Sequence, residues 1–285
     1  MIVTTMLPTG RIGDPNIGAS AAHPWAAARN GSAALAGTAA LLLAMMVPTM
    51  LAMTLDARVL NGIPVWIKPL KFEFSVAVHL LTIAWLANLL PAEVREGRAM
   101  RRAAAALIVA GMFEVLYIAL QAARGQASHF NQSNVVAIAM YALMGVGAVT
   151  LVAVSARVGV LILRQGDRRD PLVFAAGWGL VLGSVLGGLT GAYLSAQAGH
   201  WVGGTPSDAA GLPIFGWSRD GGDLRVAHFA GLHLMQVMPF AAWLLHKRAA
   251  PATTRRVVIA VAATGTLLTA AAFAQALAGR PLIGA

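Results

Sequence analysis

The feature that most constrains this chain is a series of long, uninterrupted apolar segments. A helix needs roughly 20 consecutive apolar residues to cross the hydrocarbon core of a bilayer. The chain is 58% hydrophobic and only 11% charged, which is too apolar for an ordinary soluble domain. We therefore predict an all-α integral membrane protein, a polytopic bundle of seven transmembrane helices at about residues 33–55, 69–90, 103–123, 135–155, 172–198, 224–245 and 257–277.

Lysine and arginine are unevenly distributed between alternate connections, and cytoplasmic connections carry the excess of such residues. The N-terminus is therefore expected in the cytoplasm and the C-terminus outside it, in the cell inner (cytoplasmic) membrane. Residues 1–32 are predicted to form a flexible polar tail, and residues 33–285 one transmembrane domain with extracytoplasmic loops 56–68, 124–134 and 199–223. The basic connections contain Arg95, Arg98, Arg101 and Arg102, then Arg157, Arg164, Arg168 and Arg169, and finally Lys247, Arg248, Arg255 and Arg256.

The net charge and the cysteine content exclude several functions. The formal charge is +10, but its concentration in short connections is a topology pattern, so we expect no nucleic-acid partner. The chain has no cysteine, which excludes disulfides, thiolate metal sites, iron–sulfur clusters and covalently attached c-type haem. The lipid bilayer is the expected surrounding.

Ionisable side chains inside the apolar segments indicate a functional site, because such groups are costly at membrane depth. His79, Glu114 and His233 each lie about eight or nine residues from the predicted outer end of their helices, a depth of about 12–14 Å. His79 shares a helix face with Lys71, and Tyr117 shares one with Glu114. The sequence therefore predicts a polar pocket near the extracytoplasmic side.

Further histidines lie close to this pocket in the sequence. His228 is five residues before His233, about 140° away on a helix, so we place it above the site and nearer water, paired with Asp223 or another loop residue. Asp223 also suits the N-cap of the sixth span. His129, in the loop 124–134, is either a ligand or supporting group that covers the site, or a surface histidine.

The first hypothesis for function is redox chemistry with b-type haem or another transition metal. Imidazole nitrogens bind haem iron without any cysteine. His79 and His233 would be the axial ligands, with His228 and His129 as further candidate metal ligands. Cofactor propionates would pair with Arg58, Lys68, Lys71, Arg124 or Arg225, and Glu114 and Tyr117 would support the ligands or transfer protons. A membrane or periplasmic redox partner would complete the reaction.

A second hypothesis comes from a resemblance to a known family. The segment Ser75-Val-Ala-Val-His79 resembles the Ser-x-x-x-His motif of the alkaline ceramidase and adiponectin-receptor superfamily. That resemblance implies a seven-span, zinc-dependent membrane hydrolase of lipid-like substrates. His79, His228 and His233 would be zinc ligands, with Ser75 and Glu114 beside them. The chain departs from the family pattern in its later histidine pair, which is His-x-x-x-x-His and lies on the sixth span.

Two other interpretations stay open. In a proton-coupled transporter or sensor, His79, Glu114 and His233 would titrate instead of binding metal. Alternatively, the polar side chains would form interhelical hydrogen bonds with a purely structural role. In the fifth span, four glycines recur at four-residue spacing, which predicts a smooth face for close helix packing or for a flat cofactor or lipid: Gly179, Gly183, Gly187 and Gly191.

Overall fold

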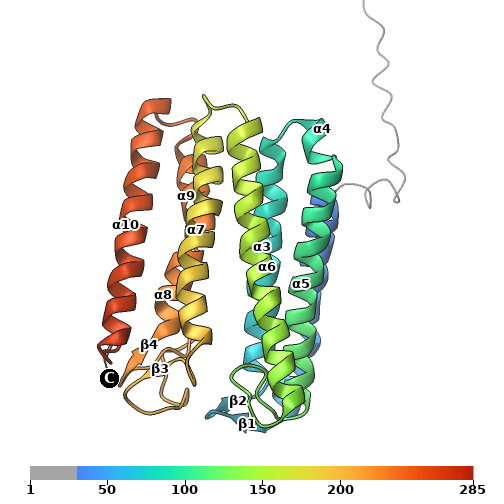
Figure 1. Cartoon of the computed structure of the whole chain (residues 1–285), viewed down its shortest axis with the longest axis vertical. Helices are drawn as coiled ribbons and strands as arrows, with labels where there is room; N and C mark the ends of the chain where they lie inside the picture. Colours follow the sequence, from blue (N-terminus) through green and yellow to red (C-terminus); the bar gives the residue numbers. More distant parts are fainter. Residues whose placement is uncertain (1–30, 285) are drawn as a thin grey trace, which may run out of the picture.

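The computed structural model describes residues 31–284, and they form a bundle of roughly parallel helices (Figure 1). The tail predicted over 1–32 lies outside the described residues, apart from its last two, which begin the first helix. The helices are α2 (Gly31–Leu55), α3 (Ile67–Leu86), η1 (Ala87–Leu89), α4 (Ala92–Arg95), α5 (Arg98–Ala123), α6 (Val135–Gln165), α7 (Pro171–Ser195), α8 (Leu224–Leu232), α9 (Leu234–Leu245) and α10 (Pro251–Leu277).

Within residues 31–284, six helical segments are long and apolar enough to cross a membrane. They correspond to all the predicted spans except the sixth, 224–245. That segment is divided into α8 and α9 at His233, and neither part reaches the length of a span. Pro239 lies inside α9, and because proline has no N–H to donate, it removes one backbone hydrogen bond from this segment.

Several helices extend further than their apolar cores suggested. The sequence placed Arg157 and Arg164 in a connection, whereas both lie in the last turns of α6, which ends at Gln165. Arg255 and Arg256 similarly lie in the first turns of α10. A long arginine side chain can keep its charge in water while its stem covers apolar surface, so a charged residue does not end a helix.

The helices pack in a sequence-ordered series. α2 packs on α3 and α5, α5 on α6, and α6 on α7, while α7 packs on α8, α9 and α10. The main apolar core lies among α2, α3, α5, α6 and α7, and a smaller one lies among α7, α9 and α10. Met235 of α9 also belongs to the main core, so α9 lies at the boundary between the two cores.

The glycine face predicted in the fifth span packs against α8 and α9. A Cβ atom added to Gly183 would lie 2.6 Å from Met235 Cγ, and one added to Gly187 would lie 2.3 Å from Leu232 Cδ2. Small residues let helix backbones approach closely. The helix-packing interpretation of this face is confirmed.

All four short strands lie at one end of the bundle, which we call the strand end (Figure 1). β1 (Val59–Leu60) pairs with β2 (Ile63–Pro64), and β3 (Trp201–Val202) pairs with β4 (Gly222–Asp223), both antiparallel. Between β1 and β2, Asn61 and Gly62 both have positive φ, as a tight hairpin turn requires. We call the opposite end, with turns 90–97, 166–170 and 246–250, the arginine end.

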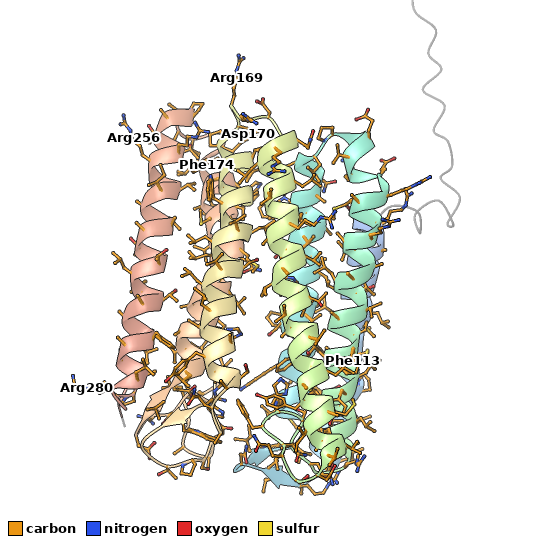
Figure 2. The ribbon with its side chains drawn as sticks, viewed as in Figure 1. Phe113, Arg169, Asp170, Phe174, Arg256 and Arg280 are labelled. Atoms are coloured by element: carbon orange, nitrogen blue, oxygen red, sulfur yellow. The ribbon has the colours of Figure 1, made fainter. Side chains whose placement is uncertain are left out.

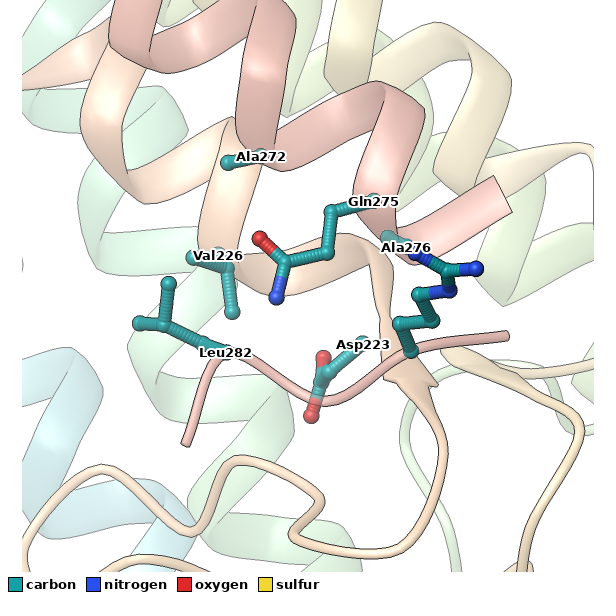
Figure 3. Close-up of a pocket in the computed structure, with 7 residues that line it drawn as sticks. Asp223, Val226, Ala272, Gln275, Ala276 and Leu282 are labelled. Atoms are coloured by element: carbon teal, nitrogen blue, oxygen red, sulfur yellow. The ribbon is translucent and has the colours of Figure 1, made fainter. Parts of the chain in front are cut away.

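The C-terminal residues return to the strand end of the bundle. Residues 278–284 follow α10, and Figure 3 shows Leu282 beside Val226 and near Asp223. The side-chain amide of Gln275 donates to the carbonyl of Pro281. The last residues therefore cover the beginning of α8.

Candidate functional site

A hydrogen bond between two polar side chains links α3 to α9 near the predicted histidines. Gln236 Nε2 donates to Thr82 Oγ1 at 3.3 Å, which joins α9 to α3. Both segments run from the strand end towards the arginine end (Figure 1). His79 and His233 each precede their member of this hydrogen bond by three residues, so each lies about 4.5 Å closer to the strand end. The two histidines are therefore at about the same level along the bundle, with the His79 ring directed to Ser155 of α6.

His79 is held by α6. Its Nε2 lies 3.0 Å from Ser155 Oγ, and the same oxygen lies 2.7 Å from the carbonyl of Leu151. A hydroxyl has one proton, and the carbonyl can only accept. Ser155 therefore donates to Leu151 and accepts from the Nε2–H of His79, which assigns the lone pair of the neutral imidazole to Nδ1. Ser75, one turn away, is exposed.

His233 lies where α8 ends and α9 begins. Its Nδ1 is 2.8 Å from the carbonyl oxygen of Phe229, and the two rings stack with centroids 3.8 Å apart. Because the carbonyl accepts, Nδ1 carries the proton and Nε2 carries the lone pair. A backbone carbonyl on one ring nitrogen is the usual arrangement that orients a metal-binding histidine. In this tautomer the lone pair on His233 Nε2 is available to a ligand.

His228 does not pair with Asp223 as the sequence suggested. Its Nδ1 donates to the carbonyl of Gly187 at 2.9 Å. A Cβ atom on Gly191 would lie 2.7 Å from the His228 ring, so the glycine face of α7 makes the space that the imidazole fills. Asp223 caps α8, accepting from the backbone N–H of Arg225, which confirms its predicted N-cap role.

Glu114 is buried in α5 against α6. A Cβ atom on Gly147 would lie 2.9 Å from Glu114 Oε1, and this oxygen has no hydrogen-bond partner within residues 31–284. Lys68 is close enough to interact with it electrostatically. Tyr117 is buried one turn further along α5 and stacks on Phe113, with ring centroids 6.2 Å apart.

His129 is packed inside the loop between α5 and α6 and is not a surface histidine. Its Nδ1 lies 3.1 Å from Ser128 Oγ, and its ring centroid is 5.7 Å from that of Phe72 and 5.9 Å from that of Tyr141. Burial holds the pKa of His129 well below its usual value of 6.5, and the positive charge of Lys68 acts in the same direction.

This burial of His129 predicts a pH dependence of stability. In the unfolded chain the imidazole takes up a proton near pH 6.5, whereas the folded chain keeps it neutral to lower pH. The unfolded state therefore binds more protons, and stability falls as the pH decreases below about 6.5. We expect melting temperatures measured between about pH 7.5 and 5.5 to fall less in His129→Asn. The control His246→Asn changes an exposed histidine and should keep the wild-type slope. An unaltered slope in His129→Asn would contradict this assignment.

A network of ion pairs between side chains lies at the strand end. Arg225 Nη2 donates to Asp208 Oδ1 at 2.8 Å, to Asp223 Oδ2 at 2.7 Å and to the carbonyl of Gly216 at 2.6 Å. His200 Nε2 lies 3.2 Å from Asp208 Oδ1. Burial raises the pKa of Asp208, but the hydrogen bond from His200 and the charge of Arg225 outweigh it and hold this pKa below its usual value.

This network includes residues that the sequence did not single out. Asp208 and His200 are both buried. The only indication in the sequence is that aspartates and Arg225 occur in one long loop and the helix start that follows it. Lys71 and Arg124 were predicted, with Arg225, to bind a cofactor. Lys71 donates to the carbonyl of Phe215 at 2.9 Å, and Arg124 is exposed at the end of α5.

The predicted zinc ligands are not assembled as a cluster. Within residues 31–284, no group of three or more His, Cys, Asp or Glu side chains is arranged to hold a metal ion. His79 bonds to Ser155, His228 to Gly187 and His233 to Phe229. Comparison of the chain with protein-family models, with curated proteins and with solved structures gives no match.

Proposed function

We propose that this protein binds b-type haem between α3 and the α8–α9 segment and carries out redox chemistry near the strand end. The observation that carries this proposal is the common level of His79 and His233, set by the Gln236–Thr82 hydrogen bond. Two imidazoles on facing helices are the ligand set that a haem iron takes in the absence of cysteine. When bound, haem would supply one-electron transfer.

The donor atoms support this assignment. His233 has its Nδ1–H held by the Phe229 carbonyl and its Nε2 lone pair available. His79 is neutral in the hydrogen-bond pattern, with a lone pair on Nδ1, and neutral imidazole is the form that binds metals. The roles of these two residues are to orient the cofactor and to fix its level in the bundle.

Nearby charges would complete the site. The Lys68 ammonium is close enough to Glu114, Asp208 and Arg225 to interact with them electrostatically. It is better placed to pair with a propionate than Arg225, whose donors are already engaged. Glu114 has one carboxylate oxygen without a partner, which suits a group that accepts and releases a proton. Tyr117 would assist it from the next turn.

The topology forms part of the same proposal. α8 and α9 together contain enough residues for a crossing, so we propose them as the seventh transmembrane segment, interrupted at His233. The arginine end would face the cytoplasm and the strand end the opposite side of an inner membrane. A membrane or periplasmic redox partner would then meet the protein at the strand end.

The proposal is tested by an oxidised-minus-reduced absorption spectrum of detergent-purified protein, with elemental analysis of the same sample. We expect bands that change on reduction, together with iron. His79→Ala and His233→Ala should each abolish the pigment, because each removes one of the two imidazoles that would hold the haem. His228→Ala and the exposed His246→Ala serve as controls and should retain it. Full pigment in both of the first two variants would overturn the ligand assignment.

A second function is favoured by a different observation. The partnerless Glu114 oxygen and the helix interrupted at His233 are features of proton-coupled transporters, whose binding sites often lie at broken helices. A colourless protein without metal, with pH-dependent flux in vesicles, would favour this function. A colourless protein with stoichiometric zinc would instead favour the membrane hydrolase.

A further inference from the structure

A cavity at the arginine end is separate from the histidine site. It has a volume of about 370 Å³ and lies between the α6–α7 connection and the first turns of α10. Three guanidinium groups line it, together with three apolar residues, and no acidic side chain is among the lining residues, which are Arg169, Pro251, Ala252, Arg255, Arg256 and Ile259.

The arginines of this cavity are available for an anion. Within residues 31–284, none of the three forms an ion pair with a carboxylate. The nearby acids are engaged with backbone N–H groups: Asp167 accepts from Arg169 N and Asp170 from Leu172 N. Figure 2 shows Arg169 and Arg256 extending at this end of the bundle, with Phe174 nearer its middle. The cavity therefore carries uncompensated positive charge.

Arg255 is held in place within this group. Its Nη2 donates to the carbonyl of Arg168 at 3.1 Å, and its guanidinium carbon lies 4.8 Å from the centroid of the Phe174 ring. A cation over an aromatic face is stabilised electrostatically, and these contacts leave other N–H donors free. A fixed guanidinium is well suited to bind phosphate oxygens in a bidentate manner.

The apolar lining indicates that the phosphate belongs to a lipid. Ile259 lines the cavity and is 54% exposed. Exposed apolar residues continue along the same helix towards the strand end, at Leu267 and Leu268. A free phosphate would use only the guanidinium groups, whereas a phospholipid would also cover Ile259 with an acyl chain. Basic pockets between transmembrane helices are known binding sites for anionic head groups.

We propose that this cavity binds an anionic phospholipid, with its phosphate on Arg169, Arg255 and Arg256 and an acyl chain along Ile259. This proposal does not depend on haem at the histidine site. It requires only that α10 faces the bilayer, as its length and apolar composition indicate.

The test uses delipidated, full-length protein and measures binding of phosphatidylglycerol by native mass spectrometry and by thermal shift. The double variant Arg255→Gln/Arg256→Gln should bind phosphatidylglycerol at least about tenfold more weakly than the wild type. The matched control Arg98→Gln/Arg102→Gln removes the same charge at the same end, from exposed positions on α5, and should bind like the wild type. Arg169→Gln, in a connection, gives a second variant if the double variant unfolds.

The outcomes separate the possible ligands. Stabilisation by phosphatidylglycerol, with none from phosphatidylcholine or from inorganic phosphate, would support the proposal, as would weaker lipid binding in Ile259→Ser. Equal stabilisation by inorganic phosphate would overturn it in favour of a free-anion site. Equal binding of phosphatidylcholine, or wild-type binding by the cavity variants, would also overturn it, because the arginines would then not select the lipid.

Discussion

Replacing Arg225 with glutamine lowers the free energy of unfolding by about 3–5 kcal/mol, because two buried carboxylates lose their shared cation. The side chains of Asp208 and Asp223 are only 7% and 1% exposed, and that of Arg225 is 27% exposed. A buried ion pair adds little net stability over apolar residues, but removing one partner leaves an uncompensated charge. Thermal and denaturant unfolding of the purified protein in detergent measures this loss.

The consequence of Arg225→Gln should extend to the 199–223 loop. Arg225 also donates to the carbonyl of Gly216, so its loss frees that part of the loop, and limited proteolysis there should accelerate. The matched control is Arg58→Gln, which breaks the pair with Asp56 at the same end. The Arg58 side chain is 51% exposed, and pairs in water contribute little, so its melting temperature should hardly change. Similar effects in both variants would show that burial does not govern the Arg225 network.

The second large effect is expected for Gly183→Val, which should cost about 3 kcal/mol or more by overpacking. A Cβ atom there would lie 3.0 Å from the backbone nitrogen of Met235 and 3.1 Å from the carbonyl of Leu232. Backbone atoms cannot rotate away as a side-chain tip can, so α7 and the α8–α9 segment must separate. Unfolding in detergent, compared with the wild type, measures the cost.

Gly188→Val is the matched control for this prediction. It makes the same change in the same helix, but the nearest atom to an added Cβ is Val152 Cγ2 at 3.9 Å. We expect little loss of stability. Because His233 lies on the displaced segment, Gly183→Val should also lose pigment if haem binds there, whereas Gly188→Val should keep it. Equal stability of the two variants would contradict the packing role of the glycine face.

The hairpin between β1 and β2 and the N-cap of α6 both follow from short-range sequence patterns. The segment 56–68, predicted as a loop, contains a hairpin that turns at Asn61-Gly62. An Asn-Gly pair is the strongest short-range indication of such a turn. The N-cap of α6 is Asn134, whose side chain accepts from Ala137 N.

The division of the sixth span was not predictable in the same way. Pro239 lacks the N–H that a regular helix needs, but the interruption lies at His233, six residues earlier. A helix can absorb a missing hydrogen bond at several nearby positions, and packing selects among them. Here the close contacts of Leu232, Leu234 and Met235 with the α7 glycines determine how the two parts sit.

The sequence by itself determined the apolar helices and the packing face on α7, since both follow from local rules. An apolar run of sufficient length has few alternatives to a membrane helix, and glycines spaced four apart necessarily share a face. It also predicted one depth for His79 and His233 by counting residues. These inferences need only helix geometry.

Only the tertiary structure decided which polar atoms meet. Ser155 reaches His79 from 76 residues away, and Arg225 meets Asp208 across 17 residues of loop and helix. No spacing rule covers such contacts, because they depend on which helices are neighbours and how each is rotated. A buried polar group must find a partner or lose free energy, but the sequence does not say which partner it is. These partners meet because α6 lies against α3 and because the 199–223 loop closes over the strand end.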